Sequence, residues 1–407
     1  MAQPMMQPVT SAASSRALYG WFIAGAAAWF MAWGMQNVLF SWLVVGELHA
    51  DAHWVGTTQT CMMLPGLVLL LFGGATADRH DRRRLLLRVH LLAAVLALAL
   101  ASIVAAGGLS FSVLIVYALC VGSLPAFALP ARDSLLSEVA GNNLMRAVTG
   151  MTMIQFVAQA LGALVGGTAR WYGSAPALVV QAAIVLIGLL PLLQLPAAAA
   201  SAVRPPVATL REIREGLREV WHSERLRPPV LLVVWNGLLF IGPFFVVFPL
   251  LVRDFYHGDI GQLGLVNMTF PLGTIVGSLT LLLRGGVRHK GRALLWSLFG
   301  GGLCLAVTAI GLPFWGFLMA IFAWGLCGAV AFNTSRTLVQ EAAPASHRAR
   351  VLSVYQLGFM GTAPLGALES GFAADLFGPL VACALSGVTM LVVVLIARSV
   401  SRIPNME

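Results

Sequence analysis

The residues Gly74-Ala-Thr-Ala-Asp78-Arg-His-Asp-Arg82-Arg-Arg84 form a short charged segment between two long apolar runs. Each flanking run is long enough to cross a bilayer as a helix, because a spanning helix takes about 20 residues. Gly74 and its neighbour Gly73 would let the preceding helix approach another one closely. A charged loop between two such runs indicates a protein that crosses a membrane several times.

The composition supports this interpretation. The chain has 407 residues, of which 59% are hydrophobic and 10% are charged, whereas a soluble domain carries about 25% charged residues. The net charge of +9 does not indicate nucleic-acid binding, because the basic residues lie in short loops beside apolar runs. The cysteines are scattered and form no CxxC pair, so we expect no metal site.

The apolar runs predict twelve membrane-spanning helices, since a helix satisfies its own backbone groups in lipid. The expected spans are residues 18–43, 55–76, 85–106, 110–131, 147–170, 175–195, 229–252, 261–283, 292–311, 313–335, 350–373 and 378–398.

The basic residues predict the orientation of these spans. All lysines and arginines except Arg170 and Arg253 lie at the two termini or in the gaps that follow even-numbered spans. Positively charged loops stay on the cytoplasmic side. We therefore expect a multi-pass protein of a bacterial-type inner (plasma) membrane, with both termini in the cytoplasm.

The sequence also repeats itself at an offset of about 204 residues. Leu161-Gly-Ala-Leu164 matches Leu365-Gly-Ala-Leu368, and Arg132 matches Arg336. Six spans per repeat keep both halves in the same orientation, which predicts a parallel repeat with a binding site at the interface of the halves. We expect an N-terminal half of residues 1–195, a cytoplasmic linker of 196–228 and a C-terminal half of 229–407. The linker contains either an amphipathic surface helix or a plain tether.

Several motifs together resemble the major facilitator superfamily. These are the Asp78 to Arg84 loop, the segment Pro130-Ala-Arg132 and the stretch from Pro344 to Arg350. They are similar to an exporter branch that includes the enterobactin exporter and putative drug and macrolide efflux proteins. The resemblance implies an all-α fold of twelve membrane helices in two six-helix halves. The sequence departs from it in the first span, where Gly34-Met35-Gln36 replaces an acidic residue.

The resemblance implies a conformational latch at one membrane face. Asp78 would lie against the start of the eleventh helix, where the helix dipole is positive, and the arginines would bind carboxylates and carbonyls of their own half. The latch residues are Gly74, Asp78, Arg79, Arg82, Arg83 and Asp133. The alternative is that the arginines only set the topology.

Polar side chains inside the spans are the candidates for a substrate cavity. An unpaired amide in hydrocarbon is costly, so each should face the cavity or, alternatively, join two helices. The candidates are Gln36, Asn37, Gln155, Gln159, Trp235, Asn236, Asn267 and Gln356.

Glu369 is the acidic residue that lies well inside a predicted span. Ionisable groups within a membrane are candidates for function, so Glu369 is the proton-coupling candidate. The alternative is a solvated position at the outer interface.

These observations favour a secondary active transporter, with proton-coupled export of a small, partly lipophilic molecule by alternating access; coupling to protons is implied by the resemblance. A lipid or lysolipid transporter of the same fold is the second hypothesis, and a receptor-like or enzyme-associated membrane protein is the third. No catalytic constellation and no GxxxxGK[ST] phosphate loop is found, so we expect neither an enzyme nor a cofactor. We expect a monomer whose partners are its substrate, the bilayer and protons.

Overall fold

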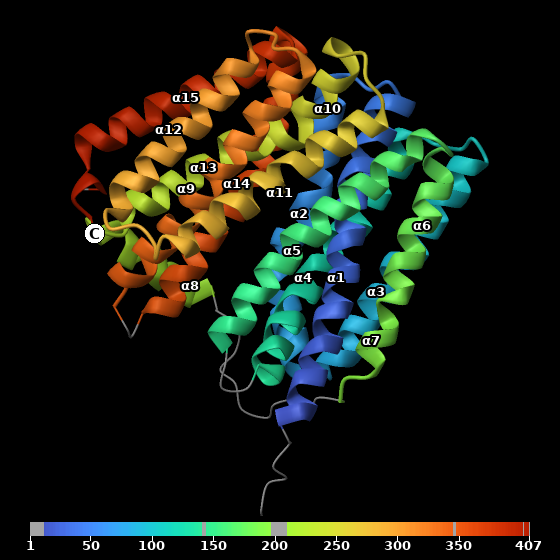
Figure 1. The fold of residues 1–407 in the computed structure, drawn as a ribbon, viewed down its shortest axis with the longest axis horizontal. Helices are drawn as coiled ribbons and strands as arrows, with labels where there is room; N and C mark the ends of the chain where they lie inside the picture. Colours follow the sequence, from blue (N-terminus) through green and yellow to red (C-terminus); the bar gives the residue numbers. More distant parts are fainter. Residues whose placement is uncertain (1–11, 141–143, 197–209, 345–346, 402, 407) are drawn as a thin grey trace, which may run out of the picture.

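The computed structural model describes residues 12–140, 144–196, 210–344, 347–401 and 403–406, and every regular element in these ranges is a helix. Figure 1 shows two groups of long helices, which meet at the top of the view and separate towards the bottom. We call them the N-terminal group and the C-terminal group.

The N-terminal group contains seven helices. They are α1 (Ala12–Trp42), α2 (Ala52–Arg79), α3 (Arg82–Ala105), α4 (Phe111–Val139), α5 (Leu144–Gly167), α6 (Ser174–Ile187) and α7 (Leu189–Leu193). A π-helical turn, Leu43–Glu47, extends α1, and a 3-10 turn, Thr168–Arg170, extends α5.

The C-terminal group follows a short helix, α8 (Leu210–His222). Its helices are α9 (Arg227–Gly242), α10 (Phe248–Leu250), α11 (Ile260–Leu283), α12 (Lys290–Thr308), α13 (Phe314–Ala342), α14 (Arg348–Phe377) and α15 (Pro379–Val400). The π-helical turns Pro243–Val247 and Leu251–Phe255 join α9 and α10 into one continuous helical segment, Arg227–Phe255.

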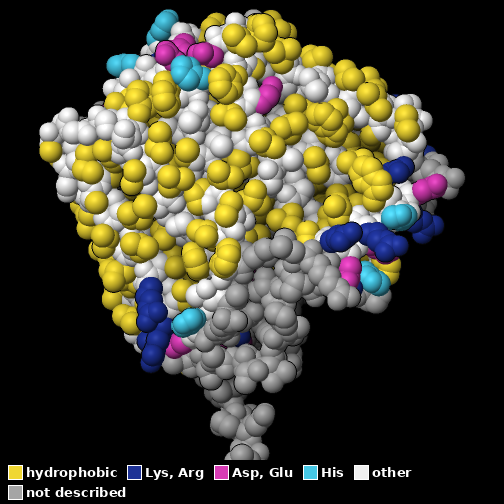
Figure 2. All heavy atoms as spheres, turned by 180° about the vertical axis from the view of Figure 1, so that it is seen from behind, with side chains coloured by type: hydrophobic (Ala, Val, Ile, Leu, Met, Phe, Trp, Pro, Cys, Tyr) yellow, Lys and Arg dark blue, Asp and Glu magenta, His cyan; other side chains and the backbone are white. Residues whose placement is uncertain are grey.

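Eleven helical segments of the described chain are long and apolar enough to span a membrane. The prediction of an all-helical membrane protein is therefore confirmed. The predicted span without a counterpart among these eleven is the second, residues 55–76, which falls within α2, a helix of 28 residues. Figure 2 shows the corresponding surface, where apolar side chains cover most of the visible face and basic side chains lie along its lower part.

The two groups pack their helices in the same order. In the N-terminal group α1 packs on α5, α2 on α4, and α3 on α6. In the C-terminal group α9 packs on α14, α11 on α13, and α12 on α15. Between the groups, α2 lies along α14 and α5 lies along α11.

Glycines allow the groups to meet at one end. A β-carbon on Gly264 of α11 would lie 2.8 Å from the Cα of Gly167 on α5. A β-carbon on Gly371 of α14 would lie 2.9 Å from the Cα of Gly56 on α2. Small residues let helix backbones approach this closely in membranes. We call this the closed end, and the other end, where α8 lies, the open end.

The helix α8 belongs to the predicted linker and packs on the start of α14. Glu215 pairs with Arg350 at 3.0 Å, and Val220 is buried in a cluster with Val351. The side chain of Trp221 remains exposed. The helix is thus partly covered by the C-terminal group, whereas residues 197–209 of the linker lie outside the described ranges.

Candidate functional site

A cavity of about 340 Å³ lies between the two groups. Its walls come from α1 and α5 on one side and from α9, α11, α12, α13 and α14 on the other. The cavity sits where α5 and α11 cross between the groups, so any relative movement of the groups would change its shape.

Five of the predicted cavity residues line this space, and all five carry carboxamides. They are Asn37, Gln155, Gln159, Asn236 and Asn267. The amide of Asn267 donates back to the carbonyl of Leu263 at 3.0 Å. Within the described residues no hydrogen bond joins the other four amides to a neighbouring side chain, so they are available to a ligand.

The rest of the cavity wall is mainly aromatic. Rings from both groups line it, including Trp33 and Phe156 from the N-terminal group and Phe244, Phe270 and Trp324 from the C-terminal group. No charged residue is found among the described residues of the wall. Such a site suits a ligand with a large apolar or aromatic part and a few hydrogen-bonding groups.

Two predicted cavity residues lie elsewhere in the helix groups. Gln36 is buried inside the N-terminal group, where its side-chain oxygen accepts hydrogen bonds from Tyr117 and Gln181, each at 2.7 Å. The alternative interpretation, a hydrogen bond between helices, therefore describes its position. Gln356 on α14 has an exposed side chain and does not line the cavity.

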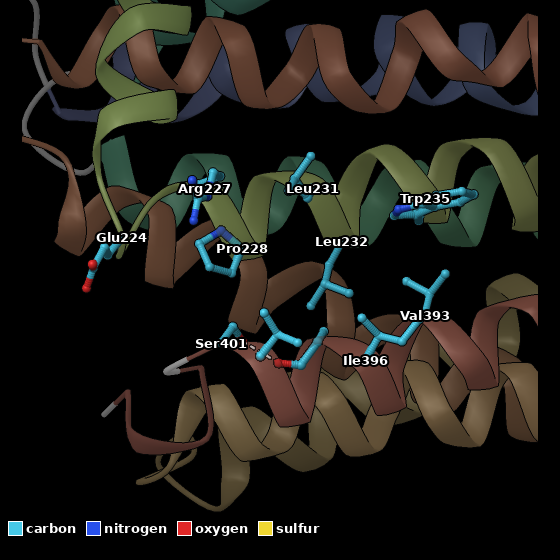
Figure 3. Close-up of a pocket in the computed structure, with 11 residues that line it drawn as sticks. Glu224, Arg227, Pro228, Leu231, Leu232, Trp235, Val393, Ile396 and Ser401 are labelled. Carbon is cyan, nitrogen blue, oxygen red and sulfur yellow. Dashed lines mark hydrogen bonds between the residues drawn. The ribbon is translucent and has the colours of Figure 1, made fainter.

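Trp235 does not line the cavity either. Its ring lines a groove on the outside of the C-terminal group, between α9 and α15 (Figure 3). Leu231, Val393 and Ile396 form the apolar walls of this groove, and Arg227 lies at its polar end. Because α9 presents Trp235 and Asn236 in different directions, only Asn236 reaches the central cavity.

A second space, of about 550 Å³, leads away from the cavity towards the open end. It lies between the first half of α5 and the last halves of α11 and α13. Phe156, Thr274 and Phe332 line both spaces, which makes them adjoining compartments. We call the second space the α5–α11 cleft.

Two polar side-chain contacts join the two groups at the closed end. Arg170, just after α5, pairs with Asp259 before α11 at 3.3 Å. His53 at the start of α2 contacts Asp375 near the end of α14, with 3.1 Å between Nδ1 and Oδ2. Both pairs lie beside the glycine contacts described above.

Arg253 makes the most extensive polar contact between the groups. Its Nη1 donates to the carbonyl of Val45 at 3.0 Å and to that of Ala50 at 2.8 Å. It also binds the carboxylate of its neighbour Asp254. Neither Arg170 nor Arg253 is among the predicted site residues, although they are the two basic residues that depart from the charge distribution. Their position on the side of the membrane with few basic residues was the sequence feature that could have identified them.

Two of the predicted latch arginines bind within the N-terminal group at the open end. The buried Arg82 pairs with Glu138 at the end of α4. Arg83 donates from Nε to the carbonyl of Leu192 at 3.2 Å and from Nη2 to that of Leu193 at 2.6 Å. Both arginines thus connect the start of α3 to other helices of the group.

The remaining predicted latch residues show no contact with the eleventh helix among the side chains that the structure describes. Asp133, the predicted carboxylate of the latch, pairs with the adjacent Arg132 at 3.2 Å, whereas the partner of Arg82 is Glu138. The side chains of Gly74, Asp78 and Arg79 lie outside those that the structure describes. The latch on the eleventh helix therefore stays a prediction.

Glu369 does not line the cavity. Its side chain is exposed and accepts a weak hydrogen bond from Ser370 at 3.4 Å. Leu365, Phe372 and Leu376, which share its helix face, are 58%, 50% and 75% exposed. Glu369 thus belongs to an apolar outer face of α14, about 12 Å from the end of the helix at 1.5 Å per residue.

The arrangement offers a space between the two helix groups where a small ligand can lie. No group of three or more potential metal ligands occurs in the part of the chain that was described. What the structure provides is one cavity shared by two helix groups, which are joined at one end and flank a cleft towards the other.

Comparisons with known proteins agree with this architecture. The family model for transmembrane secretion effectors matches residues 13–407. The staphyloferrin A transporter of Staphylococcus aureus is 22% identical over 94% of this chain and 96% of its own. The multidrug efflux pump Tap of Mycolicibacterium fortuitum is 28% identical over 85% and 86%. The enterobactin exporter EntS of Citrobacter koseri is 28% identical over 85% and 83%.

Solved structures share the fold. The crystal structure of the nucleoside transporter NupG in its D323A form superposes with a TM-score of 0.75, at 14% identity, over 94% of this chain and 99% of that chain. At this identity the similarity concerns the fold alone.

Proposed function

Because the chain belongs to the transmembrane secretion effector family of the major facilitator superfamily, we propose that it is a proton-coupled exporter of a small, partly lipophilic molecule. Its family and relatives are transporters, which favours transport over enzymatic activity. The proposal extends to the inner membrane of a bacterium, with both termini in the cytoplasm.

The single observation that carries this proposal is the shared cavity. It is lined by both groups, adjoins the α5–α11 cleft towards the open end and lies below the polar contacts of the closed end. In an alternating-access cycle, the closed-end contacts break while the open end closes around the same cavity. Substrate is then released on the opposite side of the membrane.

The direct test uses everted membrane vesicles that contain the protein. A pH gradient is imposed, and uptake is measured for a panel of dyes, antibiotics, siderophores and aromatic acids. We expect uptake of at least one compound that disappears when the gradient is collapsed. Vesicles without the protein are the control, and uptake of phospholipid analogues alone would favour the lipid-transporter hypothesis.

The orientation has its own test. Arg288→Cys places a thiol in the exposed α11–α12 loop, and Gly108→Cys places one in the exposed α3–α4 loop. In intact cells an impermeant maleimide should label Gly108→Cys and spare Arg288→Cys until the cells are permeabilised. The wild-type protein gives the background from its native cysteines. Labelling of Arg288→Cys from outside would reverse the proposed topology.

We keep Glu369 as the proposed proton carrier. Its apolar neighbours on α14 disfavour a bare charge there, and α14 packs on both α2 and α9, so a movement of the groups would change its surroundings. Glu369→Gln should abolish pH-driven export while exchange at equal pH persists. Glu219→Gln on α8 is the matched control. A normal response of Glu369→Gln to the gradient would exclude this role.

A further inference from the structure

The α5–α11 cleft carries two basic side chains, Lys290 and Arg336, and no acidic residue is found among its described lining residues. Lys290 is neutralised, because its Nζ bonds both oxygens of Glu341, at 2.9 and 2.8 Å. Arg336 is exposed, and none of the described carboxylates forms an ion pair with it. Arg336 therefore supplies the uncompensated positive charge of the cleft.

The internal repeat shows that this charge is particular to one half. The counterpart of Arg336 is Arg132, whose side chain is only 14% exposed and pairs with Asp133 at 3.2 Å. Its guanidinium also lies over the ring of Phe30, 4.8 Å from the centroid. In the second half Thr337 stands where the carboxylate of Asp133 would be. Arg132 is occupied by its own helix group, whereas Arg336 faces the cleft.

The cavity beyond the cleft has a complementary character. Its wall holds aromatic rings and carboxamides but no acidic side chain among the described residues. Aromatic rings can attract a cation, but a cation would first have to pass the charge of Arg336. An anion with an aromatic part would be stabilised in both compartments. Arg336 attracts its charge in the cleft, and in the cavity the rings contact its aromatic part while the amides donate hydrogen bonds to its oxygens.

We propose that the protein selects organic anions that carry an aromatic group, and that Arg336 recognises their negative charge in the α5–α11 cleft. This inference rests on the proposed export function, for which it names the substrate class. The side-chain amides of residues such as Gln155 and Asn236 then donate hydrogen bonds to the anionic oxygens, and the aromatic rings pack against the apolar part of the substrate.

The test compares three ligands of one shape and different charge: 2-naphthoxyacetate, its neutral amide and the cationic 2-(2-naphthoxy)ethylamine. Equilibrium dialysis with the purified protein measures their dissociation constants. We expect the carboxylate to bind about threefold to tenfold more tightly than the amide, because an exposed charge contributes modestly. The preference should hold at about 10 mM salt and fall at about 1 M, where the Debye length is ~3 Å.

The variants assign the preference to one residue. Arg336→Gln should remove it while leaving the affinity for the amide unchanged, and Arg336→Lys should retain part of it. Arg225→Gln, an exposed arginine at the same end of the molecule, is the matched control and should behave as wild type. Melting temperatures verify that all variants are folded.

Three outcomes would overturn the inference: no binding of the carboxylate at millimolar concentration, equal or better binding of the amide or amine by the wild-type protein, or an undiminished preference in Arg336→Gln. Vesicle transport separates this failure from failure of the proposed function. Transport of compounds without regard to charge refutes the anion selection alone. A charge preference in binding, together with no transport of any compound, refutes export alone.

Discussion

Replacement of Arg253 by methionine should open the closed end of the transporter. Methionine keeps an unbranched apolar stem of similar reach but has no donors. The variant therefore loses the two bonds from Arg253 to the carbonyls of Val45 and Ala50, at 3.0 and 2.8 Å. These bonds join the two groups directly, so they stabilise the observed state and cannot persist when the groups separate at this end.

The magnitude follows from the geometry. A hydrogen bond from a charged group contributes about 1.5–3 kcal/mol when well formed. The Arg253 side chain is 22% exposed, so we take about 1 kcal/mol for each bond, or roughly 2 kcal/mol in total, because water partly replaces them. This corresponds to about a 30-fold change in the equilibrium between the two states. A protein that favours the closed end by ~99:1 would then favour it by only ~3:1.

Pulsed electron paramagnetic resonance can measure this change. Spin labels at Gly108→Cys and Ile310→Cys, in exposed loops of the two groups at the closed end, should show a second, longer distance population in Arg253→Met. Asp254→Asn should not show it, because Arg253 keeps its two carbonyl partners. Arg284→Met, outside the closed end, is the second control. An unchanged distance distribution in Arg253→Met would refute the argument that these bonds hold the closed end.

Three further predictions concern the cavity amides, the glycine contact between the groups and a buried hydrogen bond. The double variant Gln155→Leu/Gln159→Leu should alter the order of substrate preference with an unchanged melting temperature, since both amides face the cavity; a large loss of thermal stability would instead make them structural. Gly264→Val should prevent close contact with Gly167, whose Cα lies 2.8 Å from the position of the added β-carbon. The same spin-label pair should then report a longer distance between the two groups at the closed end, and a wild-type distance would contradict this steric argument. Gln36→Leu leaves two buried hydrogen-bonding partners unpaired. It should lower the free energy of unfolding by about 1–3 kcal/mol and leave ligand affinity intact, as denaturation and dialysis would measure.

Five of the eight predicted cavity residues lie on the wall of the cavity between the groups. Gln155 and Gln159 on α5, with Asn37, Asn236 and Asn267, all line the space. Gln36, Trp235 and Gln356 do not line this space. A membrane helix has an apolar face towards lipid and another towards its neighbours, so hydrophobic periodicity does not reveal which face meets the cavity.

The polar contacts at the closed end could not be predicted from local sequence patterns either. Arg170 and Asp259 are 89 positions apart in the sequence, and His53 and Asp375 are 322 apart. No local pattern connects such residues. Only the packing of α5 on α11 and of α2 on α14 brings them together.

The sequence by itself determined the membrane class, the approximate spans, the superfamily and the accumulation of basic residues in alternate loops, because each depends on local composition or on a short motif. The tertiary structure decided which polar side chains share the cavity, that Arg82 pairs with Glu138 instead of Asp133, and that Arg170 and Arg253 join the two groups. It also distinguished Arg132 from Arg336, which the predicted repeat places at corresponding positions. The physical reason is that burial and pairing depend on the face that each helix presents to its neighbours, and that face is set only when the helices pack.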